Sequence, residues 1–156
     1  MRNPYRSIAT ITLIGVLGCG GHDRGGQLDA VFRLGDWEAT ESSQACRVLG
    51  REEMIHVDPQ PVLAAEDLLG ATVVFKSNRP VLELTFSETG RIQLANLTTA
   101  NQHRWLCFFV DDELLSAAVI AGRIEEGVLR FGGAFSDSRA FEIAEGINRA
   151  TRKNLE

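Results

Sequence analysis

The sequence predicts an α+β domain, a two-layer sandwich in which helices pack on one face of a mostly antiparallel sheet of hairpins. Short runs of β-branched and aromatic residues alternate with Gly, Asn, Asp and Pro, which is typical of hairpins. Near the C-terminus, apolar residues recur at helical spacing and give one helix a face for the sheet, at Ala140, Ile143, Ala144 and Ile147. A length of 156 residues suits one domain with a buried core.

The first half of the chain carries signals for four strands and a short helical turn. Acidic residues near the start of this turn favour it through the helix dipole. Proline is expected to end the second strand, because it donates no backbone hydrogen bond. The predicted elements are a strand over 30–34, a strand over 54–57 that ends at Asp58-Pro59-Gln60-Pro61, a helical turn over 64–69, and strands over 72–75 and 81–86 that form a hairpin around Ser77-Asn78-Arg79-Pro80.

The second half predicts two helices and three strands. Ser87 is a good N-cap for a helix that runs to about His103, and Ser136 is a good N-cap for the last helix. Asp111-Asp112 predicts a tight turn between two strands, and Gly127 opens a further hairpin arm. The three strands are expected over 106–110, 114–120 and 128–131.

The N-terminus has the features of a secretory signal. Arg2 and Arg6 precede an apolar run that is too short to span a bilayer comfortably. Val16-Leu17-Gly18-Cys19 resembles the bacterial lipobox, whose cysteine is lipidated and becomes the first mature residue. The alternative is an ordinary signal peptide followed by an incidental cysteine. We expect the lipoprotein arrangement, with a signal peptide over 1–18, a lipid anchor on Cys19, a flexible Gly-rich tether over 19–28 and one domain over 29–156.

Two cysteines remain in the expected domain, Cys46 and Cys107. An even number of cysteines in an oxidising compartment favours a disulfide, which over this separation would stabilise the fold by roughly 4 kcal/mol on the loop-entropy model. Alternatively, Cys107 is a small core residue, since it lies within the apolar run Trp105-Leu106-Cys107-Phe108-Phe109-Val110.

Charge and motifs argue against several classes of function. A net charge of −5 disfavours binding to the nucleic-acid backbone. The His and Cys residues match no zinc spacing, and the sequence carries no recognisable catalytic triad or phosphate loop. Asp111-Asp112-Glu113 clusters carboxylates that could bind a hard cation, but adjacent acids on a turn are more often solvated. We therefore expect neither an enzyme nor a metal or cofactor site.

A series of short motifs extends over nearly the whole expected domain. They are Phe32-Arg33-Leu34, Leu63 with Glu66-Asp67-Leu68, Glu88 with Gly90 and Leu94-Ala95-Asn96-Leu97-Thr98, the stretch from Leu106 to Ile120, and Ile124, Phe131, Gly133, Phe135-Ser136, Ala140 and Ile143-Ala144. In order and spacing, residues from about 32 to 150 resemble the head subdomain of the first periplasmic domain of SecD. SecD is a subunit of the bacterial protein-export machinery.

The chain also departs from this family. Asp112 stands where the family usually has a turn glycine, so the hairpin must use the tolerance of Asp for left-handed geometry. Ala118 replaces the usual proline. The sequence ends at Glu156, where SecD continues into the membrane helices that couple proton flow to export. We therefore expect a head domain on a lipid anchor, which is not a proton-driven motor by itself.

The resemblance implies contact with polypeptide that emerges from the translocon. Such contact needs exposed strand edges or apolar side chains. The candidates are the hairpin segment 114–120 and the segment 131–135, where Gly and Ala leave the backbone accessible. The alternative is that both are interior strands with their edges already paired. The expected partner-binding residues are Leu114, Leu115, Ser116, Val119, Phe131 and Phe135.

Two functions remain from different classes. In the first, the protein is a non-catalytic, lipid-anchored module of the bacterial cell envelope, held at the inner or outer membrane and facing the periplasm. It would bind unfolded exported polypeptide or Sec translocon subunits. In the second, it is a structural or regulatory envelope lipoprotein that binds a folded partner and has no role in export, since a fold does not fix a function.

Overall fold

The computed structural model describes residues 28–153. In this part of the chain the elements are β1 (Ala30–Asp36), β2 (Gln44–Arg47), β3 (Met54–Ala64), the 3-10 helix η1 (Ala65–Asp67), β4 (Leu68–Lys76), β5 (Arg79–Phe86), α1 (Glu88–Ala100), β6 (Trp105–Val110), β7 (Glu113–Val119), β8 (Val128–Gly132) and α2 (Asp137–Lys153).

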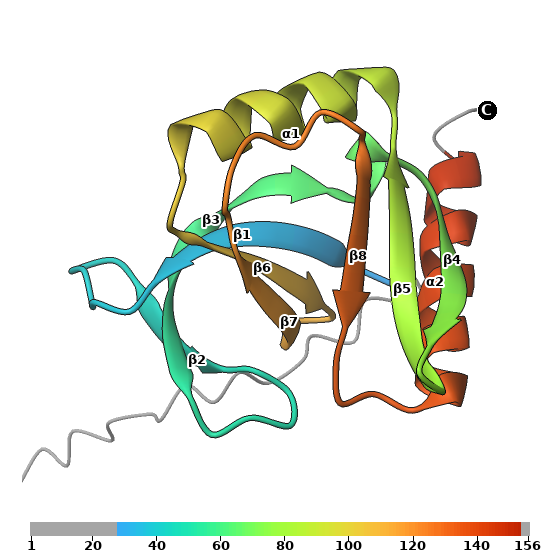
Figure 1. Cartoon of the computed structure of the whole chain (residues 1–156), viewed down its shortest axis with the longest axis horizontal. Coiled ribbons are helices and arrows are strands. Elements are labelled where there is room, and N and C mark those ends of the chain that lie inside the picture. The colour runs from blue at the N-terminus through green and yellow to red at the C-terminus, as the bar shows by residue number, and fades with distance from the viewer. Residues whose placement is uncertain (1–27, 154–156) are drawn as a thin grey trace, which may run out of the picture.

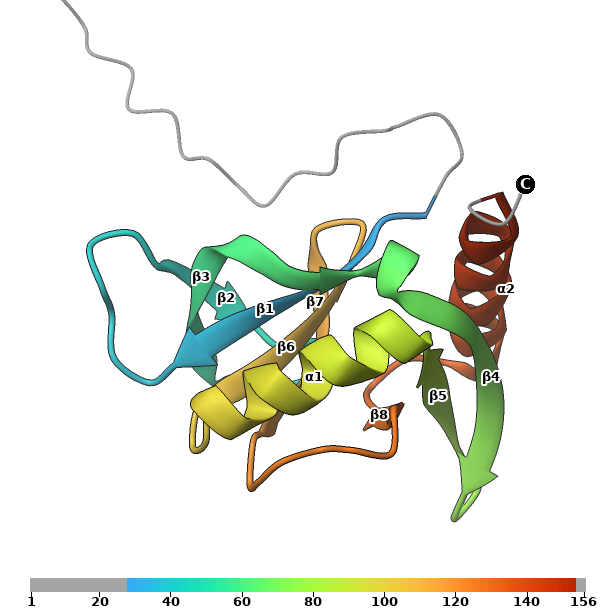
Figure 2. The ribbon, with the colours of Figure 1, turned by 90° about the horizontal axis from the view of Figure 1, so that it is seen from above.

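The strands form two antiparallel sheets. One has the order β2-β3-β1-β6-β7, and the other has the order β4-β5-β8. Figures 1 and 2 show the smaller sheet beside the larger one, with α2 packed along β4. Helix α1 lies across one end of the molecule and contacts both β3 and β5, so it joins the two sheets. The predicted α+β class is confirmed, and the strands are divided between two sheets.

The main core lies between the sheets and is filled by aromatic rings. Phe32 of β1 and Phe108 of β6 are fully buried in the larger sheet. Their ring centroids lie 5.9 and 5.1 Å from that of Phe131 on β8 in the smaller sheet. Helix α2 buries the predicted apolar face in the same core, through Ala140, Ile143, Ala144 and Ile147.

The larger sheet curls around a second apolar cluster on its other face. This cluster contains Cys46, Val48, Ile55, Val57, Cys107, Phe109, Leu114 and Ala117. The curl brings the two outer strands together, and the Leu49 N–H donates to the Leu114 carbonyl at 2.9 Å. Gly35 is required at the tightest point, because a Cβ there would lie 2.7 Å from Ile55 Cγ2 and 3.0 Å from Cys107 Sγ.

The predicted turns and caps are confirmed. Ser77 and Asn78 have φ values of 49° and 58°, and Asp111 and Asp112 have φ values of 49° and 66°. Both pairs are therefore left-handed, as two-residue hairpin turns require, and Asp112 takes the geometry expected of the missing glycine. The Ser87 hydroxyl accepts from the Gly90 N–H at 3.1 Å and caps α1. The Ser136 hydroxyl accepts from the Arg139 N–H at 3.3 Å at the start of α2.

Several element boundaries differ from the predictions. Strand β3 does not end at residue 57 but continues through Pro59 and Pro61. Its partner β2 pairs only with residues 54–57, so the later residues of β3 have no strand on that side, and Pro61 faces Arg33 beside a register shift. The helix predicted to reach His103 ends at Ala100, and the helical turn predicted over 64–69 shortens to residues 65–67.

The prediction that residues 128–131 form another hairpin arm was wrong in its pairing. These residues form β8, which pairs with β5 rather than with a neighbour in sequence. Arg130 of β8 also binds Glu83 of β5 on the outer face of the smaller sheet, with Nε and Oε2 2.7 Å apart. This long-range pairing creates the smaller sheet and places β8 beside β7.

Candidate functional site

The structure brings the two predicted partner-binding segments together. β7 is the last strand of the larger sheet and β8 is the last strand of the smaller sheet. The Ser116 hydroxyl donates to the Gly132 carbonyl at 3.0 Å, and a Cβ on Gly133 would lie 3.0 Å from the Leu115 carbonyl oxygen. We call the line along which 115–120 faces 129–133 the β7–β8 border.

Most of the predicted side chains at this border are buried. Leu114, Leu115, Ser116, Phe131 and Phe135 all expose 7% or less of their surface. Val119 is 47% exposed and is the one of the six whose side chain lies open to solvent. Any contact of a partner with the other five positions therefore involves their backbone or the walls of the adjoining cavities.

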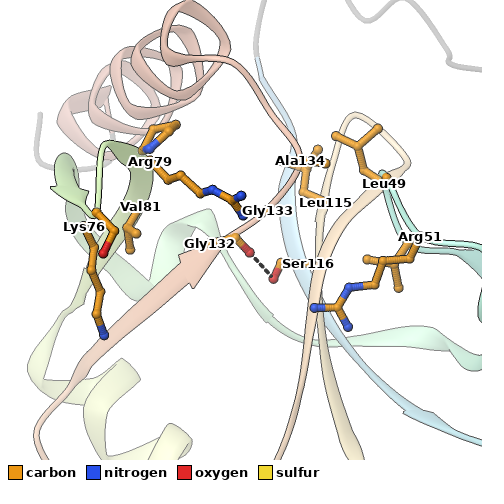
Figure 3. A pocket seen from close by; sticks show the side chains of 14 residues that line it. Leu49, Arg51, Lys76, Arg79, Val81, Leu115, Ser116, Gly132, Gly133 and Ala134 are labelled. Carbon is orange, nitrogen blue, oxygen red and sulfur yellow. Dashed lines mark hydrogen bonds between the residues drawn. The ribbon is translucent and has the colours of Figure 1, made fainter.

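The first of these cavities, of about 460 Å³, lies at one end of the border (Figure 3). We call it the basic cavity because Arg51, Lys76 and Arg79 line it and no Asp or Glu does. Its remaining walls come from the 48–50 loop, the β4–β5 turn, β7 at Leu115 and Ser116, and residues 132–134. In Figure 3, the guanidinium groups of Arg51 and Arg79 extend from opposite walls toward the Ser116–Gly132 hydrogen bond.

Two local features shape the basic cavity. Gly50 has a φ of 74° and lies so close to Ala134 that a Cβ would overlap with that of Ala134. The wall that carries Arg51 is therefore seated directly against the segment after β8. The left-handed turn at Ser77 and Asn78 reverses the chain between Lys76 and Arg79, so that both cations line the cavity from one hairpin.

The positive charge of this cavity is not compensated by ion pairs. Within residues 28–153, Arg51, Lys76 and Arg79 make no salt bridge, although the chain as a whole has a net charge of −5. Elsewhere, Arg104 binds both Asp36 and Asp58, at 2.6 and 2.8 Å. Glu52 and Glu53 follow Arg51 in the chain but are not part of the cavity lining.

The second cavity, of about 300 Å³, lies on the other side of the Ser116–Gly132 hydrogen bond. We call it the apolar cavity, because its walls are mostly hydrophobic: Leu106, Ala118, Val119, Ile120, Ile124, Leu129 and Phe131. Arg123 and Arg130 also line it, and they are paired with Glu125 and Glu83. The main core therefore reaches the surface at this point.

This arrangement is suited to binding an extended chain. In the described sheets, β7 pairs with β6 alone and β8 with β5 alone, so each presents one edge outside its ladder. Edge strands can take up a further strand through backbone hydrogen bonds, while neighbouring pockets select side chains. Exposed small residues, Ala118, Gly132 and Gly133, leave the backbone of this border accessible.

The predicted disulfide positions lie together in the second apolar cluster. Cys46 pairs with Ile55 across β2 and β3, and Cys107 is fully buried next to Ile55. Burial, together with the neighbouring Cys46, raises the pKa of the Cys107 thiol to about 12. The structure contains no disulfide between Cys46 and Cys107, and this disulfide stays a prediction.

The lipid-anchor prediction is not tested. Cys19 and its lipobox lie outside the described residues, so lipidation stays a prediction. Between residues 28 and 153, neither helix has the length and hydrophobicity needed to cross a bilayer. Over the same range, no three His, Cys, Asp or Glu side chains lie close enough together to hold a metal ion.

Comparison with known proteins gives consistent matches. Residues 40–150 match the family model described as SecDF, P1 head subdomain. The protein translocase subunit SecDF of Brucella abortus is 29% identical over 86 residues, which cover 54% of this chain and 11% of that protein. The chain thus spans only about a tenth of this relative.

Two solved structures share the fold. A crystal structure of SecDF in its super-membrane-facing form superposes with a TM-score of 0.64 and 25% identity, over 79% of this chain and 19% of that one. A second structure, of the membrane component SecDF that enhances protein export, has a TM-score of 0.63 and 23% identity, over 78% of this chain and 62% of that one. The second match supports the fold alone.

Proposed function

Because the chain belongs to the SecDF P1 head subdomain family, we propose that it acts in protein export as a non-catalytic, lipid-anchored envelope protein. Its task is to bind extended segments of exported polypeptide, or a translocon subunit, at the β7–β8 border. The observation that carries this proposal is the meeting of two sheet edges between a basic and an apolar cavity.

The geometry supports binding of an extended segment rather than of a helix. Along the border, β7 runs from the basic to the apolar cavity, and β8 runs in the opposite direction. A segment laid along it would be parallel to one strand and antiparallel to the other. Backbone hydrogen bonds contribute about 0.5–1.5 kcal/mol each in net terms, and they form with any sequence. A short pairing of this kind is weak and sequence-tolerant, which suits transient contact with many exported chains.

The Ser116–Gly132 hydrogen bond limits how such a segment can lie. It joins the two strands between the cavities, so the strands are too close there to admit a third strand between them. The segment must therefore cross over this bond or pair with one strand edge on either side of it. Val119 lies on the apolar side of the bond, with its side chain 47% exposed, and is well placed to contact a bound segment.

The lipid anchor is the second part of the proposal. The charged start, the short apolar run and the lipobox before Cys19 support it. Several acyl chains on one cysteine anchor a protein stably, whereas a single chain gives only reversible binding. Such an anchor would hold the head domain at the envelope surface where exported chains emerge.

A folded partner is the second candidate, and one observation favours it. Phe75 of β4 and Phe141 of α2 are 54% and 50% exposed, and their ring centroids lie 6.4 Å apart. Aromatic residues are enriched in protein–protein interfaces. Neither residue lines the basic or the apolar cavity, so a partner bound here would contact a different surface.

Photo-crosslinking in cells distinguishes the two candidates. A photoreactive residue at Val119 should capture exported precursors or translocon subunits, whereas the same residue at Ile92 of α1, which is 50% exposed, serves as the matched control. A third probe at Phe141 reports on the folded-partner surface. Repeated capture of one folded envelope protein from Phe141, with no precursor or translocon adduct from Val119, would overturn the first candidate and support the second.

A further inference from the structure

We infer that the basic cavity selects clients by charge: it binds a carboxylate of an extended polypeptide segment whose apolar side chain, about four residues away, enters the apolar cavity. This inference rests on the proposed function and names the class of segment that the border prefers. It does not follow from the backbone edges alone, which would bind any sequence.

The first step is the uncompensated charge. Arg51 comes from the loop after β2, and Lys76 and Arg79 come from the strand ends that flank the β4–β5 turn. All three line one cavity and make no ion pair within the described residues. The sequence contains 21 Asp and Glu residues, and other arginines form salt bridges with them, as Arg130 does with Glu83. Opposite walls bring Arg51 and Arg79 toward the same space (Figure 3).

The second step is the chemistry of the group that would fill this space. Arginine presents a planar fork of donors that matches a carboxylate, and two arginines from opposite walls can bind both of its oxygens. In a polypeptide, the carboxylates are the side chains of Asp and Glu and the C-terminus. We assign the site to these groups, because the strand edges that adjoin the cavity are suited to the backbone of the same molecule.

The third step is the spacing between the two cavities. Leu115 and Ser116 line the basic cavity, and Ala118, Val119 and Ile120 line the apolar one, so the middles of the two linings are three to four residues apart along β7. At about 3.3 Å per residue this is roughly 10–13 Å. Side chains four residues apart in an extended segment point to the same side. A carboxylate and an apolar side chain at this spacing can therefore reach both cavities at once.

The test compares two fluorescent, unstructured peptides that differ at one position. One has Glu four residues from a Leu, and the other has Gln in place of Glu. Affinities of the full-length protein in detergent are measured by fluorescence anisotropy at low ionic strength. We expect about five- to tenfold tighter binding of the Glu peptide, since exposed ion pairs are individually weak, and the difference should shrink as salt is added.

Two triple variants locate the effect. R51Q/K76Q/R79Q should bind both peptides equally. R149Q/R152Q/K153Q removes the same number of charges from exposed, unpaired positions on α2 and should keep the preference for Glu. Thermal unfolding of both variants shows that each is folded before binding is measured.

The outcomes separate this inference from the proposed function. If the wild-type protein binds both peptides equally, the carboxylate assignment is overturned and the proposed function stands. If it binds neither peptide, both are overturned. A Glu preference that persists in R51Q/K76Q/R79Q also overturns the assignment. A third result would also overturn the carboxylate assignment. In it, the wild-type protein binds vesicles of acidic phospholipid, only R51Q/K76Q/R79Q loses this binding, and the two peptides bind equally.

Discussion

Replacing Asn148 by Ala is predicted to destabilise the domain, because this side chain seals the outer edge of β4. The Asn148 Oδ1 accepts from the Ala71 N–H at 2.7 Å, and its Nδ2 donates to the Ala71 carbonyl at 2.8 Å. One amide on α2 thus takes the place of a neighbouring strand residue. A Cβ on Gly70 would lie 2.8 Å from the same Oδ1, so the helix approaches the strand as closely as glycine allows.

The expected loss of stability is about 2–4 kcal/mol. Two hydrogen bonds contribute about 0.5–1.5 kcal/mol each. Ala71 is 4% exposed, so water reaches its backbone groups poorly, and leaving them unpaired adds to the cost. The higher helix propensity of Ala returns roughly 0.5 kcal/mol. For a domain of this size the change corresponds to a decrease in Tm of about 7–15 °C.

Urea denaturation followed by circular dichroism measures this change. Asn148→Asp keeps the acceptor but places a carboxylate oxygen against the Ala71 carbonyl oxygen, and this repulsion should make it at least as destabilising as Asn148→Ala. Arg149→Ala, at the next and exposed position, is the matched control and should stay within about 0.5 kcal/mol of the wild type. An Asn148→Ala protein as stable as this control would refute the idea that the amide seals the strand edge.

Three further predictions can be checked directly. Cys19→Ser should move the protein from the membrane fraction to the soluble fraction, and retention in the membrane would contradict the lipid anchor. If Cys46 and Cys107 form a disulfide, thiol labelling in urea should require a reductant. If they stay thiols, Cys107, with its pKa raised to about 12, should react slowly in the native state at mildly alkaline pH and quickly in urea. Phe108→Ala should lower the free energy of unfolding, measured by chemical denaturation, by about 3–5 kcal/mol, because Phe108 is fully buried against two other rings. Phe108→Leu should lower it by roughly 1.5 kcal/mol or less.

The sequence predicted the local elements well because their signals are local. Turn residues with left-handed φ values marked both two-residue hairpins, and serine caps marked the starts of both helices. Proline misled the prediction for β3. Its missing N–H matters only where a neighbouring strand needs it, and β2 is too short to reach Pro59 and Pro61. The extent of a neighbouring strand is not visible in the sequence around a proline.

The division into two sheets depends on a long-range pairing. β5 and β8 are separated by α1 and the β6–β7 hairpin, and no local signal indicates that residues 128–132 pair with 81–85. The candidate binding segments stay a prediction. Small residues marked 114–120 and 131–135 separately, and their meeting at one border is a result of the tertiary fold that the sequence did not predict. The cations were missed, because Arg51 lies in a loop, Lys76 and Arg79 lie at the ends of two strands, and they meet only through the tertiary fold.

The edges of the two sheets differ in what lies against them, and this difference bears on where the proposed function is placed. Four strands end the two sheets: β2, β7, β4 and β8. The edge of β4 is capped by Asn148, and the segment after β2 is joined to β7 where the Leu49 N–H donates to the Leu114 carbonyl. At the β7–β8 border, a single side-chain hydrogen bond joins the strands, with a cavity on each side. Exposed strand edges invite aggregation, and proteins normally protect them. The side where β2 faces β7 also has a single hydrogen bond and a cavity of about 420 Å³, so an open edge alone does not distinguish the β7–β8 border. What distinguishes it is the adjoining group of three cations that make no salt bridge within residues 28–153, and for this reason the proposed function is assigned to this border.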